Sequence, residues 1–479
     1  MLHDIKLSDI SLPLKGSWWG LLFAAIFLVA CTPGGQNTPD TPTKPSPMQM
    51  SAKRGVSFDF KKIDDLPLLS PAISWSYNWG NDQNASAALW FDTNDMDFCP
   101  MCWNGSYSAA KIRQYVQEHP NTKYLLGFNE PNLTDQCNMT PSQAAQYWPQ
   151  VVALAKELNL CLVSPAMNYG TLAGYHDPIK WLDEFFALPN VSLDDIHAIA
   201  IHCYMASPSA VKDYIKKFEK YGKPIWMTEF CAWDPVPSNV EKQMDYMCAV
   251  LNHMEQNPNV ERYAWFMPRT SGKVDSAPYM QLLTHGSPVE LTPLGQIFTQ
   301  FSSFDKNAYL SLEKGVGAHQ YIALKEENIS IRVTDDNQLY IQSFMQGQWI
   351  DYQVNVQNKQ PLQIRYASIV NSQLCIYIDG VAQAIIDIPK TTDLQTVSTF
   401  TTAIIPPLGN HTLRLEALKG TDFRYTFCRL HRGFHHRFGL CSVHHQRVRR
   451  WSRRCRYRVV RVPLRRFGRC LRTHIPRRS

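Results

Sequence analysis

Residues 124–132 read Tyr124-Leu125-Leu126-Gly127-Phe128-Asn129-Glu130-Pro131-Asn132, an apolar run with strand character that leads directly into a glutamate. A second run of this kind, Pro224-Ile225-Trp226-Met227-Thr228, leads into Glu229. A carboxyl group at the carboxyl end of a buried parallel strand is typical of the catalytic face of a (β/α)8 barrel. Strand and helix patterns alternate between the two glutamates, so the sequence predicts that both lie on that face.

A pair of carboxyl groups on one barrel face indicates hydrolysis of a glycosidic bond. In that reaction one carboxylic acid protonates the leaving oxygen and one carboxylate attacks the sugar or activates water. Retaining enzymes hold the two groups about 5–5.5 Å apart, and inverting enzymes about 6.5–9.5 Å apart. The alternative for the first motif is a helix start, with Asn129 as its cap and Pro131 in its first turn.

The segment 54–304 has the alternating pattern of a parallel sheet wrapped by helices, which predicts a (β/α)8 TIM barrel. Eight strands are expected, at residues 55–60, 72–75, 96–103, 124–129, 161–166, 198–204, 224–229 and 262–266. Helices are expected between them at residues 108–118, 141–158, 179–188, 209–221 and 238–256.

A second domain is expected at residues 311–423, where period-two alternation replaces the helical pattern. Such short alternating runs separated by turns predict an antiparallel β-sandwich. Its expected strands are residues 329–333, 339–343, 350–356, 363–367, 375–378 and 412–417.

The amino end has the pattern of an export signal. Residues 1–30 carry Lys6 and Lys15 before an apolar core that is too short to span a membrane. The core ends in Leu28-Val29-Ala30-Cys31, which is similar to a bacterial lipobox, so Cys31 is the predicted lipidation site. Residues 31–53 then form a Pro/Thr-rich linker. This pattern predicts a lipoprotein at the cell surface or outer membrane; the alternative is a secreted protein in which Cys31 is incidental.

The carboxyl end has a different composition. Residues 424–479 contain 18 arginines and no lysine, aspartate or glutamate. The rest of the chain has 30 basic and 41 acidic residues, a formal charge of −11, so it offers nothing to nucleic-acid phosphates. We interpret this Arg-rich tail as the product of a shifted reading frame from about residue 423, or as a disordered segment.

The cysteines do not predict a metal site. Cys99 and Cys102 have a spacing seen in zinc sites, but no matching Cys or His pair lies nearby. A disulfide between Cys102 and Cys137 is the preferred alternative, since an exported chain permits one. Neither a metal nor a nucleotide motif is apparent, so no cofactor is expected.

Side chains near the strand ends are the candidates for substrate binding. His202 and Tyr204 are two residues apart on one strand and therefore share a face. Trp75, Trp103 and Trp265 end three other strands, where an exposed indole would stack on a sugar ring. Trp79, Trp90 and Trp233 follow in loops and would extend the groove.

Several of these segments resemble glycoside hydrolase family 128, the retaining clan A barrels that cleave β-1,3-glucans. The resemblance covers residues 54–266 and rests on Arg54-Gly55-Val56-Ser57-Phe58, Ile73-Ser74-Trp75-Ser76-Tyr77-Asn78-Trp79, Pro100-Met101-Cys102-Trp103, Leu126-Gly127-Phe128-Asn129-Glu130-Pro131-Asn132, Ile201-His202-Cys203-Tyr204, Trp226-Met227-Thr228-Glu229-Phe230 and Ala264-Trp265-Phe266.

The resemblance implies that Glu130 is the general acid/base and Glu229 the nucleophile of an endo-β-1,3-glucanase. Asn129 is expected to hydrogen-bond the sugar 2-hydroxyl. The negative charge of Glu229 is expected to raise the pKa of Glu130, so that this group carries a proton in the free enzyme. The open alternatives are a clan A hydrolase of another β-glucan or of mannan, and a surface glycan-binding lipoprotein without catalysis.

The sandwich resembles a family-six-type carbohydrate-binding module. The matching segments are Gly347-Gln348-Trp349-Ile350-Asp351-Tyr352, Ile364-Arg365-Tyr366-Ala367-Ser368 and Gly409-Asn410-His411-Thr412-Leu413-Arg414-Leu415. The expected partners are therefore a β-1,3-glucan polysaccharide and, through the lipid anchor, a membrane. In that family a final strand follows the last of these segments, at the position where the Arg-rich tail begins.

Overall fold

The structure is a computed structural model that describes residues 50–430, apart from residues 71, 326, 328, 336, 343 and 420–422; for residues 423–430 it describes the backbone only. The predicted export signal, Cys31, most of the linker and the tail beyond residue 430 lie outside the described residues. None of the helices in the described part of the chain combines the length and apolar character that a membrane crossing requires.

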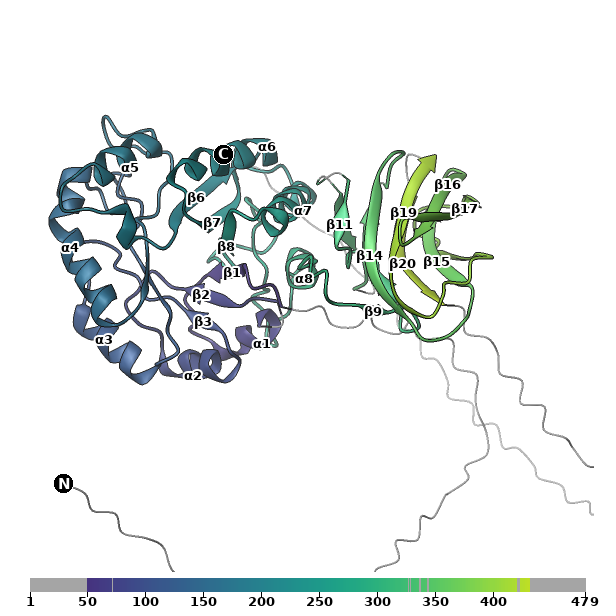
Figure 1. Ribbon diagram of the computed structural model, residues 1–479, viewed down its shortest axis with the longest axis horizontal. Coiled ribbons are helices and arrows are strands. Elements are labelled where there is room, and N and C mark those ends of the chain that lie inside the picture. Colours follow the sequence, from purple (N-terminus) through teal and green to yellow (C-terminus); the bar gives the residue numbers. More distant parts are fainter. Residues whose placement is uncertain are drawn as a thin grey trace, which may run out of the picture. The chain divides into compact units, whose positions relative to one another are not determined.

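The first half of the described chain forms a closed parallel barrel with helices outside it (Figure 1). Its strands are β1 (Arg54–Ser57), β2 (Trp75–Tyr77), β3 (Asp97–Phe98), β4 (Tyr124–Leu126), β5 (Cys161–Val163), β6 (Ile199–Met205), β7 (Ile225–Asp234) and β8 (Val260–Trp265). Six of them form one sheet in the order β3-β2-β1-β8-β7-β6, and β4 pairs with β5. Parallel bridges Met101–Leu126 and Val163–Ala198 connect these two parts, so the eight strands close into a ring. The predicted TIM barrel is confirmed.

Helices alternate with these strands along the chain. They are α1 (Leu66–Leu69), α2 (Ala85–Thr93), α3 (Ala109–Glu118), α4 (Pro141–Glu157), α5 (Pro178–Phe186), α6 (Pro208–Phe218), α7 (Val240–Gln256) and α8 (Pro293–Gln300), with 3-10 turns η1 (Ile63–Asp65), η2 (Leu193–Asp195) and η3 (Glu219–Tyr221). The sequence explains where they begin, because most follow a side chain that caps them. Thr140 and Gln143, for example, form a reciprocal capping box at the start of α4.

Two layers of side chains give the barrel its core. Large and small residues alternate inside the ring, where Trp75, Tyr77, Met101 and Trp226 face Ala198, Ala200 and Ala264. A larger apolar cluster fills the space between the strands and the surrounding helices. This division fixes the direction of each side chain, since successive residues of a strand point to opposite faces.

The second domain is the predicted antiparallel sandwich. One sheet has the order β12-β13-β20-β15-β18 with β10 beside β20, and the other has the order β11-β14-β19-β16-β17 with β9 beside β14. The strands are β9 (Leu310–Ser311), β10 (Val316–Gly317), β11 (Ala323–Leu324), β12 (Ser330–Val333), β13 (Leu339–Gln342), β14 (Trp349–Val356), β15 (Leu362–Ser368), β16 (Ser372–Ile378), β17 (Val381–Ile388), β18 (Ser398–Thr401), β19 (Gly409–Lys419) and β20 (Phe423–Leu430).

The last strand corrects one predicted boundary. The sandwich was expected to end at residue 423, but β20 runs to Leu430 and pairs with β13 and β15 in the interior of its sheet. The alternation of Phe423, Tyr425 and Phe427 with smaller or polar residues suits a strand, and the arginine content of this segment hid that pattern.

Two predictions about cysteines also differ from the structure. Cys102 and Cys137 are free thiols rather than a disulfide. The apolar run Leu160-Cys161-Leu162-Val163 likewise predicts a buried thiol, but the side chain of Cys161 is exposed because it begins β5 at the rim of the barrel.

Candidate active site

Glu130 and Glu229 both lie at the carboxyl ends of barrel strands. Glu130 follows β4, and its backbone N–H donates to the carbonyl of Ala166 after β5. Glu229 lies within β7, beside His202 of β6. Both glutamates are more than nine-tenths buried. The barrel geometry thus places both carboxyl groups on the face that the sequence predicted.

His202 joins the two carboxyl groups. Its Nδ1 lies 2.9 Å from Oε1 of Glu130 and 3.4 Å from Oε2 of Glu229. One donor atom from each of the three residues falls within 4.8 Å of the others. One oxygen of each carboxylate therefore lies no more than 4.8 Å from an oxygen of the other, which is short enough for the retaining arrangement. Glu130, His202 and Glu229 are also the one group of three or more described residues whose ligand atoms lie close enough together to hold a metal ion.

The backbone at Glu130 is in the left-handed region, with φ of 44°. A non-glycine residue in this region is uncommon and costs conformational energy, and such residues cluster at functional sites. Asn168, which follows β5, donates its Nδ2 to Oε1 of Glu130 at 3.0 Å. The carboxyl group is therefore held from two neighbouring strands, by Asn168 and by His202.

The protonation of Glu130 differs from the prediction. Burial alone would raise the pKa of Glu130, but the charge and hydrogen bond of His202, together with the bond from Asn168, lower it below its ordinary value. Burial would likewise lower the pKa of His202, but the charges of Glu229 and Glu130 raise it. The pKa of Glu130 is therefore shifted down and not up as expected, and the two shifts together favour a carboxylate on Glu130 beside a protonated His202.

Three side chains donate to Glu229, and His202 lies beside it. Oε1 accepts from the hydroxyl of Tyr77 at 2.8 Å and from Nε1 of Trp79 at 2.7 Å. Oε2 accepts from the hydroxyl of Tyr204 and lies near Nδ1 of His202. Burial and the charge of Glu229 raise the pKa of Tyr77 and Tyr204 well above the ordinary value, so both phenols keep their protons and act as donors.

A cleft of about 570 Å³ opens above the two glutamates. Its walls are largely aromatic and include Trp79, Trp103, Tyr204, Trp233 and Phe266. Trp233 is 40% exposed, so part of its indole is accessible to a ligand. Clefts with aromatic walls and a few converging polar groups are the usual form of a small-molecule site.

Asn129 lies in this cleft with an unused acceptor. Its Nδ2 donates to Gln136, while its buried Oδ1 has no hydrogen-bond partner among the described residues. A buried amide oxygen without a partner is costly unless a ligand or water satisfies it. The position agrees with the predicted contact to a sugar hydroxyl.

Three predicted substrate-binding residues do not reach the cleft. Trp75 is fully buried inside the barrel because β2 begins, rather than ends, at this residue. Trp265 points outward and packs against Phe298, since its neighbour Ala264 faces the barrel interior. His202 is fully buried and contacts the glutamates instead of the cleft. The expectation that these three contact sugar was wrong, whereas Asn129, Trp103 and Tyr204 do line the cleft.

Sequence reasoning missed three contacts. Tyr77 and Asn168 were not candidates, and Trp79 was expected only to extend the groove. The alternation Trp75-Ser76-Tyr77-Asn78-Trp79 could have indicated that Tyr77 shares a face with its neighbours. No motif marks Asn168.

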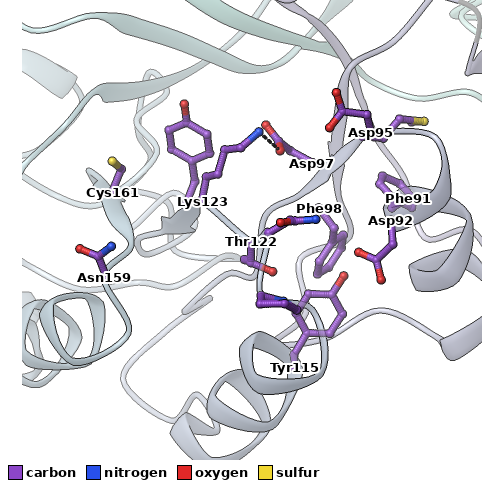
Figure 2. Close-up of a pocket in the computed structure, with 14 residues that line it drawn as sticks. Phe91, Asp92, Asp95, Asp97, Phe98, Tyr115, Thr122, Lys123, Asn159 and Cys161 are labelled. Atoms are coloured by element: carbon purple, nitrogen blue, oxygen red, sulfur yellow. Dashed lines mark hydrogen bonds and ion pairs between the residues drawn. The ribbon is translucent and has the colours of Figure 1, made fainter. Parts of the chain in front are cut away.

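A second cavity of about 550 Å³ lies at the opposite end of the strands (Figure 2). It is lined by residues where β3, β4 and β5 begin, and Asp97 within it pairs with Lys123 at 2.8 Å and with Arg262. The amino end of a barrel is associated with stability rather than catalysis. Because Asp97 is already paired with two cations, this cavity offers no free acid or base from that residue.

Residues 55–298 match the family model described as the glycosyl hydrolase catalytic core. The chain belongs to this family. The predicted enzyme class, a glycoside hydrolase, is confirmed. Residues 325–428 match the model of carbohydrate-binding module family 35, so the expected carbohydrate-binding sandwich is confirmed but its family-six type was wrong.

Individual relatives give the following similarities. An endo-beta-1,3-glucanase of family GH128 subgroup II from Pseudomonas viridiflava is 35% identical, covering 52% of this chain and 98% of that one, with a TM-score of 0.47. The corresponding enzyme from Sorangium cellulosum is 31% identical, covering 52% and 97%, with a TM-score of 0.46. Alkali-sensitive linkage protein 1 of Schizosaccharomyces pombe is 31% identical over 232 residues, which span 46% of this chain and only 40% of that relative.

Proposed function

We propose that this glycoside hydrolase is a retaining endo-β-1,3-glucanase, with Glu130 as the general acid/base and Glu229 as the nucleophile. The observation that carries the mechanism is the short separation of the two carboxylates around His202. Support for the substrate comes from sequence identity of 35% and 31% to two endo-beta-1,3-glucanases over nearly their whole length.

The reaction has two displacements. An oxygen of Glu229 bonds to the anomeric carbon while the glycosidic C–O bond breaks, and the leaving oxygen takes a proton from Glu130. Water then attacks the glycosyl-enzyme, giving its proton to Glu130, and the bond to Glu229 breaks. The sugar therefore keeps its β configuration.

The proton required by Glu130 is supplied by His202. Nδ1 and Oε1 are 2.9 Å apart, so the proton crosses one hydrogen bond when a sugar displaces water from the cleft. Loss of water from the cleft makes the charged imidazolium of His202 and the charged carboxylate of Glu130 less favourable. Transfer of the proton from His202 to Glu130 makes both groups neutral.

Asn129 and the aromatic walls orient the sugar. The free Oδ1 of Asn129 would accept from the 2-hydroxyl, a bond that strengthens as the oxocarbenium character develops. Trp103 and Trp233 offer indole faces to neighbouring glucose rings.

A substrate panel tests the function. Laminarin should release reducing ends, whereas carboxymethyl-cellulose and mannan should not, with Glu229→Gln as the blank. Proton NMR of the first products from laminarihexaose should show the β anomer. A product that starts as the α anomer would contradict the retaining mechanism, and exclusive release of glucose would contradict internal cleavage.

We also propose that the protein is exported and anchored through lipidated Cys31, in accordance with the lipobox-like sequence. Labelling of cells with a palmitate analogue should mark the wild type and not Cys31→Ser, and the variant should move from the membrane fraction to the soluble fraction. Equal labelling of both proteins would contradict the anchor.

A further inference from the structure

The hydrogen bonds to Glu229 are not equivalent. Tyr77 is fully buried in the barrel core, so it can only hold the carboxylate. Trp79 donates to the same oxygen, Oε1, at 2.7 Å, but its ring also lines the cleft. The residue therefore has contact both with the carboxylate and with the space that a sugar would occupy.

The backbone of Trp79 is held in an unusual conformation. Its φ is 61°, in the left-handed region that a bulky side chain rarely adopts. The ring packs edge-on against Tyr77, with centroids 5.5 Å apart, and against Phe266, with centroids 6.0 Å apart. These contacts leave the indole N–H directed at Glu229 and fix the donor before a substrate binds.

The side chains that donate to Glu229 in the described part of the chain are two phenols and one indole, and Nδ1 of His202 lies 3.4 Å from its Oε2. If His202 gives its proton to Glu130, the negative charge of Glu229 depends on the phenols and the indole. Hydrogen bonds to a charged group are among the stronger ones, so each of these neutral donors contributes to the position of the carboxylate.

We propose that Trp79 is a positioning residue for the nucleophile: its indole N–H holds Oε1 of Glu229, while its ring forms a wall of the cleft. The inference rests on the proposed function. Trp79 would thereby couple sugar binding to the position of the nucleophile, because a sugar that packs against the indole ring also limits movement of its N–H donor. Trp79 thus acts on the chemical step and is more than a stacking surface.

The test measures the first displacement alone. In 2,4-dinitrophenyl 2-deoxy-2-fluoro-β-laminaribioside the leaving group needs no acid. Glu229 bonds to the anomeric carbon, and the dinitrophenolate leaves with the electron pair of the broken C–O bond. The time course of dinitrophenolate release gives the inactivation constant ki and the binding constant KI, and mass spectrometry identifies the labelled residue.

The variant Trp79→Phe keeps an aromatic ring and removes the N–H. Its ki should fall about 10- to 100-fold, while KI changes by less than about threefold. Trp90→Phe is the matched control, because Trp90 lies in α2, outside the lining of the cleft, and its Nε1 has no hydrogen-bond partner among the described residues. Its ki and KI should both stay within about twofold of the wild type.

Each outcome separates the possibilities. A normal ki with a raised KI in Trp79→Phe would overturn the proposal and leave Trp79 as a cleft wall. Equal losses of ki in both variants would also overturn it. Thermal unfolding shows whether Trp79→Phe is folded, and if it is not, Trp79→His, which retains an N–H donor, should label faster than Trp79→Leu. Failure of the wild type to label at Glu229 would instead contradict the proposed function.

Discussion

The imidazole of His202 lies between two carboxyl groups and offers them a single nitrogen, Nδ1. That nitrogen can donate to one of them at a time. With one proton shared among an imidazole and a carboxyl pair, the net charge stays the same whether the proton is on His202 or on Glu130. A proton that moves between His202 and Glu130 therefore leaves the total charge of the site unchanged.

The pKa shifts of this pair predict how stability depends on pH. Glu130 has a lowered pKa, so its contribution is present above the ordinary value of 4.5 and is lost as pH falls through its folded pKa. His202 has a raised pKa, so its contribution is present below the ordinary value of 6.5 and is lost as pH rises through its folded pKa.

The free-energy difference of unfolding between the wild type and Glu130→Gln/His202→Gln should therefore be greatest between about pH 4.5 and 6.5. Urea titrations at five pH values would measure it. A difference that does not vary with pH would contradict the shared proton.

The two glutamates should also respond differently to an added nucleophile. Glu130→Ala should lose about 10²- to 10⁴-fold in kcat on laminarin, the usual contribution of general acid–base catalysis. On an aryl β-laminaribioside whose leaving group needs no acid, azide should restore part of the activity of Glu130→Ala and give a β-glycosyl azide, because no base is needed for its attack on the glycosyl-enzyme. Glu229→Ala should give only an α-azide, and a β-azide from it would reverse the assigned roles.

How well the sequence predicted a site residue depended on whether its place within a strand had to be known to a single residue. Glu130 and Glu229 were identified because each ends an apolar run. This signal does not change when the predicted strand boundary is wrong by a few residues. Trp75 and Trp265 were misplaced because a shift of one or two residues moves a side chain to another face or to the other end of a strand. The position of Asn168 and the hydrogen bond from the Trp79 indole depend on the loops that follow strands. The conformation of such loops cannot be predicted from the periodicity of the sequence.

At the scale of the strand, β1 approaches β2 so closely that it needs glycine. A Cβ at Gly55 would lie 2.5 Å from Nε1 of Trp75, whose ring fills the barrel interior beside it. This contact allows the large indole to fit inside the ring of strands. It also explains why a large side chain is found at residue 75 and glycine, which has no side chain, at residue 55.

Gly55→Ala should therefore destabilise the barrel by about 1–3 kcal/mol, the usual cost of extra volume in a packed core. Gly272→Ala is the control, since its Cβ would meet only the Ser276 and Thr270 hydroxyls, at 3.1 Å and 3.4 Å, in a loop. Chemical denaturation should show a change below about 0.5 kcal/mol for the control. Equal stability of the two variants would contradict the close approach.

At the scale of the whole molecule, the fold classes of both domains followed from their periodicities. All eight barrel strands were predicted within a few residues, because parallel barrel strands are short, apolar and separated by helices. The strands β9, β10, β11, β17, β18 and β20 of the sandwich were missed. β17 is a mostly exposed edge strand without the usual buried alternation, and β20 lies in arginine-rich sequence.

The position of β20 predicts the effect of truncation. It pairs with both β13 and β15, so its removal would leave two strands of the same sheet without a partner. A chain that ends after Lys419 should lose the thermal transition of the sandwich and become sensitive to protease within residues 311–419. A chain that ends after Arg432 should unfold at the same temperature as the full protein, and a lower temperature would contradict this boundary.

The interior place of β20 also has a consequence for biosynthesis. A ribosome makes the strands of the barrel first, and the barrel can close as soon as β8 has left the exit tunnel. The sandwich cannot be completed so early, because the position between β13 and β15 in its sheet stays empty until β20 is translated. The nascent protein must therefore keep the edge of β13 from pairing with other chains while about ninety further residues emerge, and the edge of β15 while about sixty emerge.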